Sequence, residues 1–232
     1  MSSGAMFWWN MLKQMGAVYE CPKDSQGIRL GPLVGYAGKD EDGVAYVGDV
    51  YANLAVLERH PEYLASIANM LIETHPVLST ANVFCGAPEG GKSLALLLAR
   101  QRQVTYCYPD QEVVKGTRDK KLEFLRHEGT LQGKYVVIVE DVLNNFSTTD
   151  TLISLIEEQG GHVVAIAGVL NRSLVVEDRW HDLLVCSAIR RPIHQYRQTD
   201  DEVKDDIAKG NVVLKPKHEW ERLAYAMRHF PA

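Results

Sequence analysis

The hydrophobic pattern of the first eighty residues predicts two amphipathic helices with a hairpin between them. Over residues 6–17, apolar side chains recur at helical spacing, and we expect this stripe to be buried. The stripe consists of Phe7, Met11, Leu12 and Met15. Residues 61–75 begin with a proline, which suits the first turn of a helix, and repeat the same apolar period. Residues 27–50 are rich in glycine and β-forming residues, and their turn sequence "KDEDG" predicts an antiparallel hairpin.

From about residue 82 the pattern changes to short apolar runs that alternate with helical segments. The apolar runs are "NVFCG", "QVTYCY", "KYVVIVED", "HVVAIAGVL" and "DLLVCSAI". Strands that are apolar on consecutive positions and separated by helices predict an α/β fold, with a parallel sheet covered on both faces. Ligands of such sheets bind at the carboxyl ends of the strands, so chemistry is expected just after each run. Beyond residue 190 the sequence is mixed and charged, with a helix expected over 217–229.

Composition and charge narrow the range of partners. The 232-residue chain is 46% hydrophobic and 24% charged, an ordinary globular composition, and its formal net charge is -5. This charge offers no basic surface, so we expect no nucleic-acid partner. The four cysteines show no metal-binding spacing and fit a reduced, cytoplasmic protein. No apolar run has the length of a membrane span, and the start "MSSGAM" lacks the layout of a signal peptide, so we expect no membrane partner.

A glycine-rich turn follows the first apolar run of the predicted sheet. Residues 86–93 match G-x-x-x-x-G-K-[ST], the pattern of a nucleotide phosphate loop. A turn of this kind exposes backbone N–H groups and the positive end of a helix dipole, so we expect it to bind an anion. Its residues are Gly86, Ala87, Pro88, Glu89, Gly90, Gly91 and Lys92. The pattern alone does not identify the anion.

Two adjacent acids, Glu140 and Asp141, end the apolar run "KYVVIVED". In a nucleotide hydrolase one of them would bind magnesium, and in a structural role they would cap a helix or face solvent. Neither interpretation explains the polar residues that follow, whose hydroxyls, amides and backbone N–H groups form a second anion cradle before a helix. These residues are Asn144, Asn145, Ser147, Thr148 and Thr149, with Phe146 among them. Two cradles with carboxylates between them suit a sugar phosphorylated at both ends, which describes phosphoribosyl pyrophosphate.

The stretch "VVIVEDVLNNFSTTD" resembles the signature of the type I phosphoribosyltransferases, an apolar strand followed by two acids and a threonine- and glycine-rich loop. "GAPEGGKSLA" is similar to that family's pyrophosphate loop, and "AGVLNRS" to the strand end that carries its base-contacting arginine. "WNMLKQMGAVYE" is similar to its first helix, and "GDVYANLAVLERHPEYLASIANMLIE" to the segment between its hood and first core helix. The resemblance runs from about residue 8 to 190 and is greatest to orotate phosphoribosyltransferase.

The resemblance implies an architecture and an activity. The architecture is a type I phosphoribosyltransferase-like parallel sheet flanked by helices, with a small hood subdomain. Residues 1–75 would form the first helix and the hood, 76–190 the core, and 191–232 a C-terminal segment that packs on core or hood. The activity is magnesium-dependent transfer of the 5-phosphoribosyl group from phosphoribosyl pyrophosphate to a pyrimidine-like base such as orotate, with release of pyrophosphate. A homodimer that acts in pyrimidine biosynthesis is also implied.

The same resemblance assigns roles to the two acids and the two loops. Glu140 and Asp141 would hold the ribose hydroxyls, residues 144–149 the 5′-phosphate, and residues 86–92 the pyrophosphate. Which residues would bind the magnesium ion is left open.

Three residues are expected to contact the base. Arg172, in the family's place for an arginine at a strand end, would pair with the carboxylate of an orotate-like base. The alternative is that Arg172 is an ordinary surface arginine. Lys39 and Tyr46, in the N-terminal part of the chain, are further candidates for base contacts.

The segment from residue 109 to 134 is long and basic, which is typical of a lid; the alternative is a disordered, solvated loop. The family has a mobile basic loop here, which reaches into the partner subunit's site. Positive charge from such a loop would stabilise the leaving pyrophosphate. The lysines expected to act in catalysis are Lys115, Lys120 and Lys121, and the other lid residues are Arg118, Arg126 and His127.

Some positions depart from the family pattern. Asp110 and Gln111 stand where the family has an Arg-Lys pair, and Phe146 stands where it usually has glycine, so the ring could crowd the 5′-phosphate. Lys92 and Ser93 replace an apolar residue and a proline, and they create the nucleotide-loop pattern. Two alternatives follow: a non-catalytic relative that binds the phosphorylated ligand without turning it over, and a phosphate-loop ATPase or GTPase.

Overall fold

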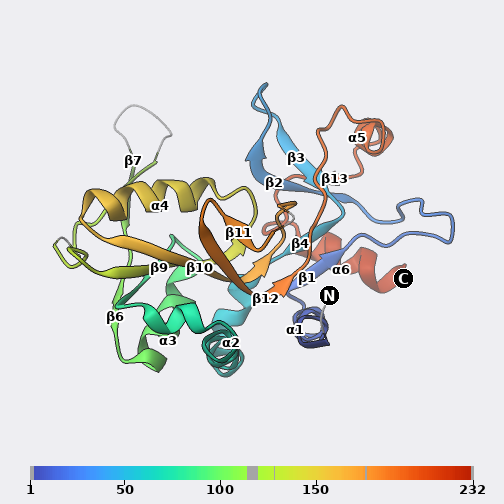
Figure 1. The fold of residues 1–232 in the computed structure, drawn as a ribbon. Coiled ribbons are helices and arrows are strands. Elements are labelled where there is room, and N and C mark those ends of the chain that lie inside the picture. The colour runs from blue at the N-terminus through green and yellow to red at the C-terminus, as the bar shows by residue number, and fades with distance from the viewer. Residues whose placement is uncertain (1–2, 114–119, 128, 176, 231–232) are drawn as a thin grey trace. The chain divides into compact units, whose positions relative to one another are not determined.

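A computed structural model describes residues 3–113, 120–127, 129–175 and 177–230 of the chain. The chain divides into two compact units (Figure 1). The core unit consists of Met1–Trp8 with Leu57–Pro192, and the second unit consists of Trp9–Val56 with Ile193–Ala232. The predicted boundary at residue 75 therefore falls inside the core unit, and the C-terminal segment shares a unit with the N-terminal hairpin.

A six-stranded sheet forms the centre of the core unit, in the order β11-β12-β10-β9-β5-β6. Its strands are β5 (Val83–Gly86), β6 (Thr105–Cys107), β9 (Tyr135–Leu143), β10 (His162–Asn171), β11 (Arg179–Trp180) and β12 (Leu183–Arg190). Every pairing is parallel except that of the edge strand β11 with β12. The predicted α/β fold with a parallel sheet is confirmed. The strand order reverses between β5 and β9, and such a reversal is where open α/β sheets bind their ligands.

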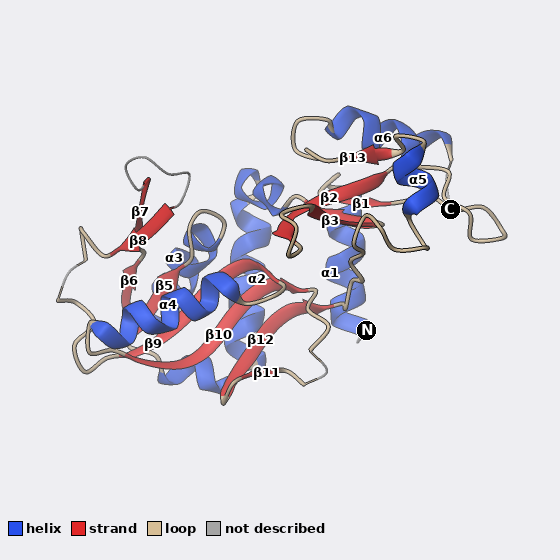
Figure 2. Ribbon diagram, turned by 90° about the horizontal axis from the view of Figure 1, so that it is seen from above, coloured by secondary structure: helices blue, strands red, loops and turns tan. Residues whose placement is uncertain are grey.

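Helices cover both faces of this sheet (Figures 1 and 2). Helices α2 (Pro61–Thr74) and α3 (Gly91–Arg102) pack together on one face, and α4 (Ser147–Glu158) lies on the other. The four residues 136–139 of β9 are all fully buried, which explains why this strand is apolar on consecutive positions. The short 3₁₀ helices are η1 (Leu54–Arg59) and η2 (Pro76–Thr80).

An antiparallel hairpin, β7 (Asp110–Val113) and β8 (Lys120–Glu123), stands where the sequence predicted only a loop. The physical reason is the alternation of Leu122 and Phe124, which the many charges of this segment obscure. Phe124 is buried and Leu122 packs against the same apolar cluster under α4, so one face of β8 is anchored to the core.

The second unit contains two small sheets. Strands β1 (Val18–Glu20) and β4 (Val50–Ala52) pair antiparallel, and a second sheet has the order β13-β2-β3. Its strands are β2 (Leu33–Lys39), β3 (Ala45–Gly48) and β13 (Val212–Val213). The antiparallel pairing of β2 with β3 confirms the predicted hairpin. The remaining helices are α1 (Ser3–Gln14), α5 (Lys204–Ala208) and α6 (Trp220–His229), of which α1 begins in the core unit.

The buried face of α1 differs from the predicted stripe. Phe7 is 61% exposed, so its assignment to the core was wrong. The buried side chains are Ala5, Trp8, Trp9 and Leu12, which also recur at helical spacing. Both stripes satisfy the period of a helix, and the two tryptophans bury more apolar area than the methionines, which decides between them.

Candidate functional site

The adjacent acids Glu140 and Asp141 point to opposite faces of the sheet. Glu140 lies on the α4 face, where its Oε1 accepts a hydrogen bond of 2.5 Å from Thr149 Oγ1. Asp141 lies on the α3 face, where its carboxylate fills the space beside Gly90 so closely that a Cβ on Gly90 would be 2.3 Å from it. Successive side chains of a strand alternate between faces, so two neighbouring acids supply one carboxylate to each loop.

The glycine loop, residues 86–92, is held against β9 at this edge of the sheet. The Ala87 amide donates a 2.8 Å hydrogen bond to the carbonyl of Val139. A Cβ on Gly91 would lie 2.0 Å from that same oxygen, so only glycine permits this close approach. Helix α3 begins at Gly91. The amides of Gly91 and Lys92 donate to the carbonyls of Ala87 and Glu89 in the loop, at 3.1 and 3.5 Å. The positive end of the helix dipole lies at this loop, and the expected binding of an anion there stays a prediction.

The hydroxyl loop, residues 144–149, turns sharply before α4. The amide and the hydroxyl of Ser147 both donate to Asn145 Oδ1, at 3.3 and 3.1 Å. Phe146 adopts a left-handed backbone conformation with φ of 58°, which explains why relatives would favour glycine at this position. Helix α4 begins at Ser147, so its amino end lies in this loop. The hydroxyl of Ser147 donates to Asn145, and that of the buried Thr149 donates to Glu140.

The ring of Phe146 is buried rather than placed over the loop. It stacks on Trp180 with ring centroids 4.5 Å apart and an interplanar angle of 14°. Trp180 Nε1 in turn donates a 2.6 Å hydrogen bond to Asp150 in the first turns of α4. The Phe146 ring therefore does not crowd this loop, because it packs into an apolar cluster with Leu143 and Ile166.

Burial raises the pKa of Glu140 to about 7. The hydrogen bond from Thr149 acts in the opposite direction, and the nearby charge of Asp141 raises the pKa further. Burial dominates because a carboxylate loses its hydration when it leaves water. Glu140 thus changes its charge near neutral pH, as acids at functional sites often do.

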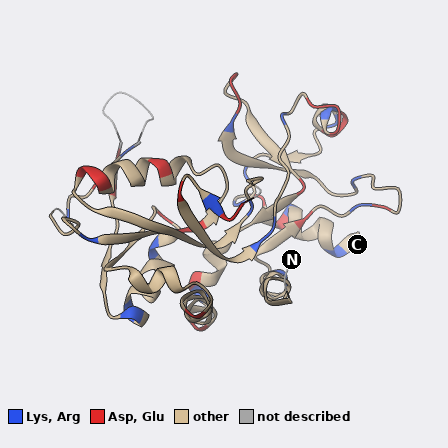
Figure 3. Cartoon of the chain, in the orientation of Figure 1, with Lys and Arg blue, Asp and Glu red and all other residues tan. Residues whose placement is uncertain are grey.

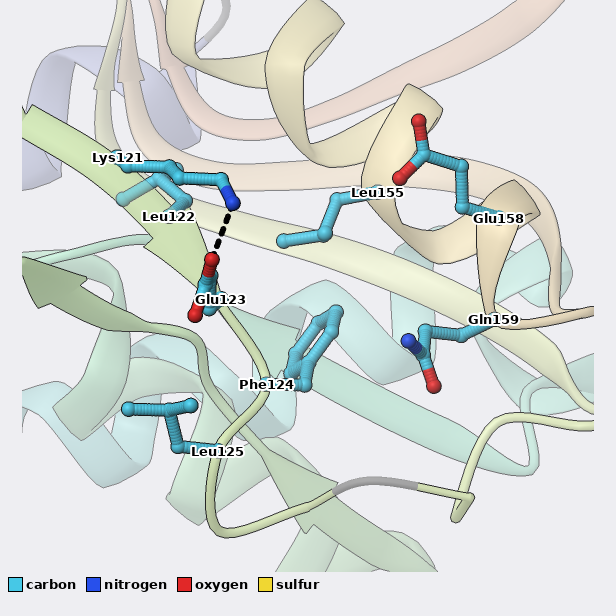
Figure 4. Close-up of a pocket in the computed structure, with 8 residues that line it drawn as sticks. All are labelled: Lys121, Leu122, Glu123, Phe124, Leu125, Leu155, Glu158 and Gln159. Carbon is cyan, nitrogen blue, oxygen red and sulfur yellow. Dashed lines mark hydrogen bonds and ion pairs between the residues drawn. The ribbon is translucent and has the colours of Figure 1, made fainter.

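The structure does not bring Lys121 to the two loops. Lys121 of β8 forms an ion pair with Glu123 and lines a cavity of about 290 Å³ with Leu155 and Glu158 at the far end of α4 (Figure 4). Ser147 and Glu158 are the two ends of the 12-residue helix α4, about 16 Å apart along the helix axis. The helix ends in two acidic residues, Glu157 and Glu158, and it also carries Asp150 in its first turn (Figure 3).

Other predicted lid residues divide into two groups. Lys115 and Arg118 lie outside the described residues, and so does the side chain of Lys120. Arg126 and His127 are described, and both contact Tyr108, which comes directly after β6. Tyr108 was missed by the sequence interpretation, although its position at the end of the run "QVTYCY" marks it as a residue at the carboxyl edge.

Arg172 follows β10 and is 8% exposed, so the alternative of an ordinary surface arginine is wrong. Its neighbours Asn171 and Ser173 are also buried, and Ser173 Oγ donates a 2.7 Å hydrogen bond to Asn171 Oδ1. Arg190 of β12 holds the same segment by donating to the carbonyl of Ser173 at 2.8 Å. This supporting arginine was not predicted, since only the spatial pairing of β10 with β12 reveals it.

Lys39 and Tyr46 belong to the second unit, on β2 and β3. Their expected contacts with the base stay predictions.

The described residues contain no group of three or more histidine, cysteine or acidic side chains placed to bind a metal ion. None of the described helices has the length and apolarity needed to span a membrane.

Comparison with solved structures identifies the fold. An orotate phosphoribosyltransferase from Aeropyrum pernix matches 78% of this chain and 92% of its own, with a TM-score of 0.56 at 17% identity. A phosphoribosyltransferase from Corynebacterium diphtheriae matches 82% of this chain and 96% of its own, with a TM-score of 0.55 at 18% identity. The chain therefore has the fold of the type I phosphoribosyltransferases, as the resemblance in its sequence implied.

Comparison of sequences gives more specific relatives. No protein-family model matches the chain. Curated relatives named orotate phosphoribosyltransferase are 28% identical over 125 residues in Caldicellulosiruptor bescii and 30% identical over 128 residues in Carboxydothermus hydrogenoformans. Each match covers 53% of this chain, and the chain spans 61% and 62% of the two relatives. The predicted resemblance to orotate phosphoribosyltransferases is confirmed.

Proposed function

We propose that this protein is a phosphoribosyltransferase of the orotate type. It transfers the 5-phosphoribosyl group from phosphoribosyl pyrophosphate to a ring nitrogen of a pyrimidine-like base. The bond from ribose C1 to the pyrophosphate oxygen breaks and both electrons leave with pyrophosphate, while a new bond forms from C1 to nitrogen and the proton of that nitrogen is released. The observation that carries the proposal is the pair Glu140 and Asp141, with one carboxylate facing each of two anion-binding loops.

Each of the two loops would bind one end of the substrate. The glycine loop at the start of α3 would bind the pyrophosphate, and the hydroxyl loop at the start of α4 would bind the 5′-phosphate. Glu140 and Asp141, between them, would accept hydrogen bonds from the ribose hydroxyls. The two loops would hold the substrate at both ends, so most of the rate acceleration would come from positioning and charge stabilisation.

Magnesium fits this arrangement. Two carboxylates are too few to hold a metal ion alone, but they suit Mg²⁺, which binds one or two carboxylates with substrate phosphates and keeps several waters. Glu140 or Asp141 would contact the ion or its waters. When bound, the ion would neutralise charge on the departing pyrophosphate.

The base would bind near Arg172, which follows β10 at the same edge of the sheet. A guanidinium pairs well with a carboxylate, and orotate carries one. We also propose a homodimer and a cytoplasmic location. All four cysteines are free and buried, which suits a reducing compartment.

The decisive experiment measures thermal stability with Mg²⁺ and phosphoribosyl pyrophosphate, ATP or GTP in parallel, and then pyrophosphate release with orotate, uracil or adenine added. Stabilisation by phosphoribosyl pyrophosphate together with release that requires orotate supports the proposal. Stabilisation only by ATP or GTP would overturn it and favour a nucleotide hydrolase. Release with adenine but not orotate would retain the transferase and reject the orotate specificity.

A non-catalytic relative is the second candidate. The observation in its favour is Asp110, which stands in β7 where the family places a basic residue and forms a 3.5 Å ion pair with Arg126. Such a protein would be stabilised by phosphoribosyl pyrophosphate yet release no pyrophosphate with any base.

A further inference from the structure

The ammonium of Lys92 lies between two chain segments at the carboxyl edge of the sheet. Its Nζ is 3.4 Å from each carboxylate oxygen of Glu89 in the glycine loop. It is also 4.8 Å from the ring centroid of Tyr108. Glu89 follows β5 and Tyr108 follows β6, and these two strands are parallel neighbours. The charge of Lys92 is therefore held beside the loop that would bind pyrophosphate.

This chain has no basic residue at positions 110 and 111, where the family has an Arg-Lys pair. Asp110 and Gln111 occupy these positions, within β7, and Asp110 uses Arg126 as its ion partner. Lys121 lies at the opposite end of α4, beside Glu123 and Glu158. Among the described lysines predicted to act at the site, Lys92 is the one attached to an anion-binding loop.

The present partners of Lys92 hold it weakly. The side chain of Glu89 is 77% exposed and that of Lys92 is 28% exposed, and ion pairs this exposed contribute little to stability. A cation over a tyrosine ring near the surface also contributes little. A pyrophosphate carries several negative charges, so it would compete effectively for this ammonium.

We propose that Lys92 contacts the leaving pyrophosphate and stabilises its developing charge, in place of the basic residues missing at positions 110 and 111. The inference rests on the proposed function and names a catalytic residue for it. As the C1–O bond breaks, the electron pair moves to the pyrophosphate oxygens, and Lys92 donates hydrogen bonds to them while keeping its proton. Tyr108 is a positioning residue that holds the ammonium at the loop. This role would explain why residues 86–93 match the nucleotide-loop pattern. In nucleotide-binding proteins and in this chain, the lysine after the glycine turn would bind the phosphates of a diphosphate group.

The test compares the binding of two product fragments by calorimetry, in the presence of Mg²⁺. Inorganic pyrophosphate probes the glycine loop, and ribose 5-phosphate probes the hydroxyl loop. We expect Lys92→Met to weaken pyrophosphate binding about 10- to 100-fold, the loss of a hydrogen bond to a charged group, and to lower kcat with phosphoribosyl pyrophosphate. Binding of ribose 5-phosphate should not change. Lys92→Arg should restore most of both losses.

Arg100→Met is the matched control, since Arg100 is exposed and lies in the last turn of α3, at the opposite end of that helix from Lys92. It should behave as wild type. Unchanged pyrophosphate affinity and kcat in Lys92→Met would overturn the inference, and so would an equal loss of both ligands with a lowered Tm, which indicates a structural role. If wild type binds neither pyrophosphate nor phosphoribosyl pyrophosphate, the proposed function itself fails. Turnover by wild type with a fully active Lys92→Met refutes only the role of Lys92.

Discussion

Phe146 stacks on Trp180, and this contact holds the residue before α4 in a left-handed backbone conformation. Trp180 Nε1 also bonds to Asp150, so the edge strand β11 fixes both the turn and the first turns of the helix. The chain thus stabilises with an aromatic pair a conformation that glycine adopts without cost. The hydroxyl loop depends on this pair for its shape.

We predict that Phe146→Ala destabilises the protein more than Phe146→Gly does. Both variants lose the stacked pair, but alanine keeps the cost of the left-handed conformation, about 1–2 kcal/mol, whereas glycine does not. Urea denaturation of the two variants measures the difference. Equal stability, or a less stable glycine variant, would show that the backbone conformation of Phe146 is not what the stack maintains.

Trp180→Ala tests the link from this pair to the ligand. We expect a lower Tm and weaker binding of ribose 5-phosphate, because the hydroxyl loop loses its support. Pyrophosphate binding should be retained, since β11, which carries Trp180, is separated by three strands of the sheet from β5, which leads into the glycine loop. A variant that binds both ligands as wild type does would contradict the role of the pair in shaping the loop.

Asp141→Asn tests the acid that faces the glycine loop. The substitution keeps the size of the side chain but removes the charge, so it should lower kcat/KM for phosphoribosyl pyrophosphate about 10- to 100-fold while the fold persists. Steady-state kinetics of pyrophosphate release, with circular dichroism to check folding, measure the effect. Asp182→Asn, at an exposed position beyond β11, is the control and should be fully active. Undiminished turnover in Asp141→Asn would defeat the assignment of this acid to the ribose.

The sequence predicted the buried strands well because their signal is local. The apolar run that precedes Glu140 predicted a strand buried on both faces, and this strand is β9 in the structure. The hairpin of β7 and β8 was missed because its apolar positions, Leu122 and Phe124, are two residues among many charges. Burial of that strand depends on α4, which lies far along the chain.

The site was predictable as a set of motifs but not as a geometry. The two acids could be identified because they end an apolar run of the sequence. Both loops could be identified because each follows such a run. Their geometry could not be predicted in the same way. Glu140 faces one loop and Asp141 the other, and the sequence does not reveal which face of β9 packs against α4. The supporting residues Trp180 and Arg190 could not be found, since each acts through a contact with a segment distant in the sequence. The place of Tyr108 at the end of an apolar run was visible, but its contact with Lys92 was not.

The raised pKa of Glu140 predicts how stability depends on pH. Its pKa rises from an ordinary value of 4.5 to about 7 in the folded state. Between these values the folded protein holds a proton that the unfolded chain has released. The group's stabilising contribution is therefore present below pH 4.5 and is lost as pH rises to about 7, by an amount on the order of 3 kcal/mol.

Glu140→Gln should remove this pH dependence. The variant stays neutral, so at pH 8 its free energy of unfolding should exceed that of wild type, and the difference should shrink toward pH 4.5. Binding should change in the opposite sense, because ribose hydroxyls donate best to the carboxylate. The affinity of wild type for phosphoribosyl pyrophosphate, relative to that of Glu140→Gln at each pH, should increase from pH 6 to pH 8. A constant ratio would show that Glu140 does not titrate in this range or does not contact the ligand.

Gly90 and Gly91 are neighbours whose substitution by alanine should have different consequences. A Cβ at Gly90 would meet the carboxylate of Asp141 at 2.3 Å, and that side chain can rotate away. A Cβ at Gly91 would lie 2.0 Å from the backbone oxygen of Val139, which is fixed within the sheet. We therefore expect Gly90→Ala to fold with a Tm close to wild type but to lose kcat/KM about as severely as Asp141→Asn, because it displaces the same carboxylate. Gly91→Ala should instead lower the Tm by several degrees, because the loop and the start of α3 must move away from β9. Thermal unfolding and pyrophosphate release, measured on both variants, separate the two effects. A Gly90→Ala variant with full activity would mean that the close contact between the glycine loop and Asp141 has no part in binding the substrate.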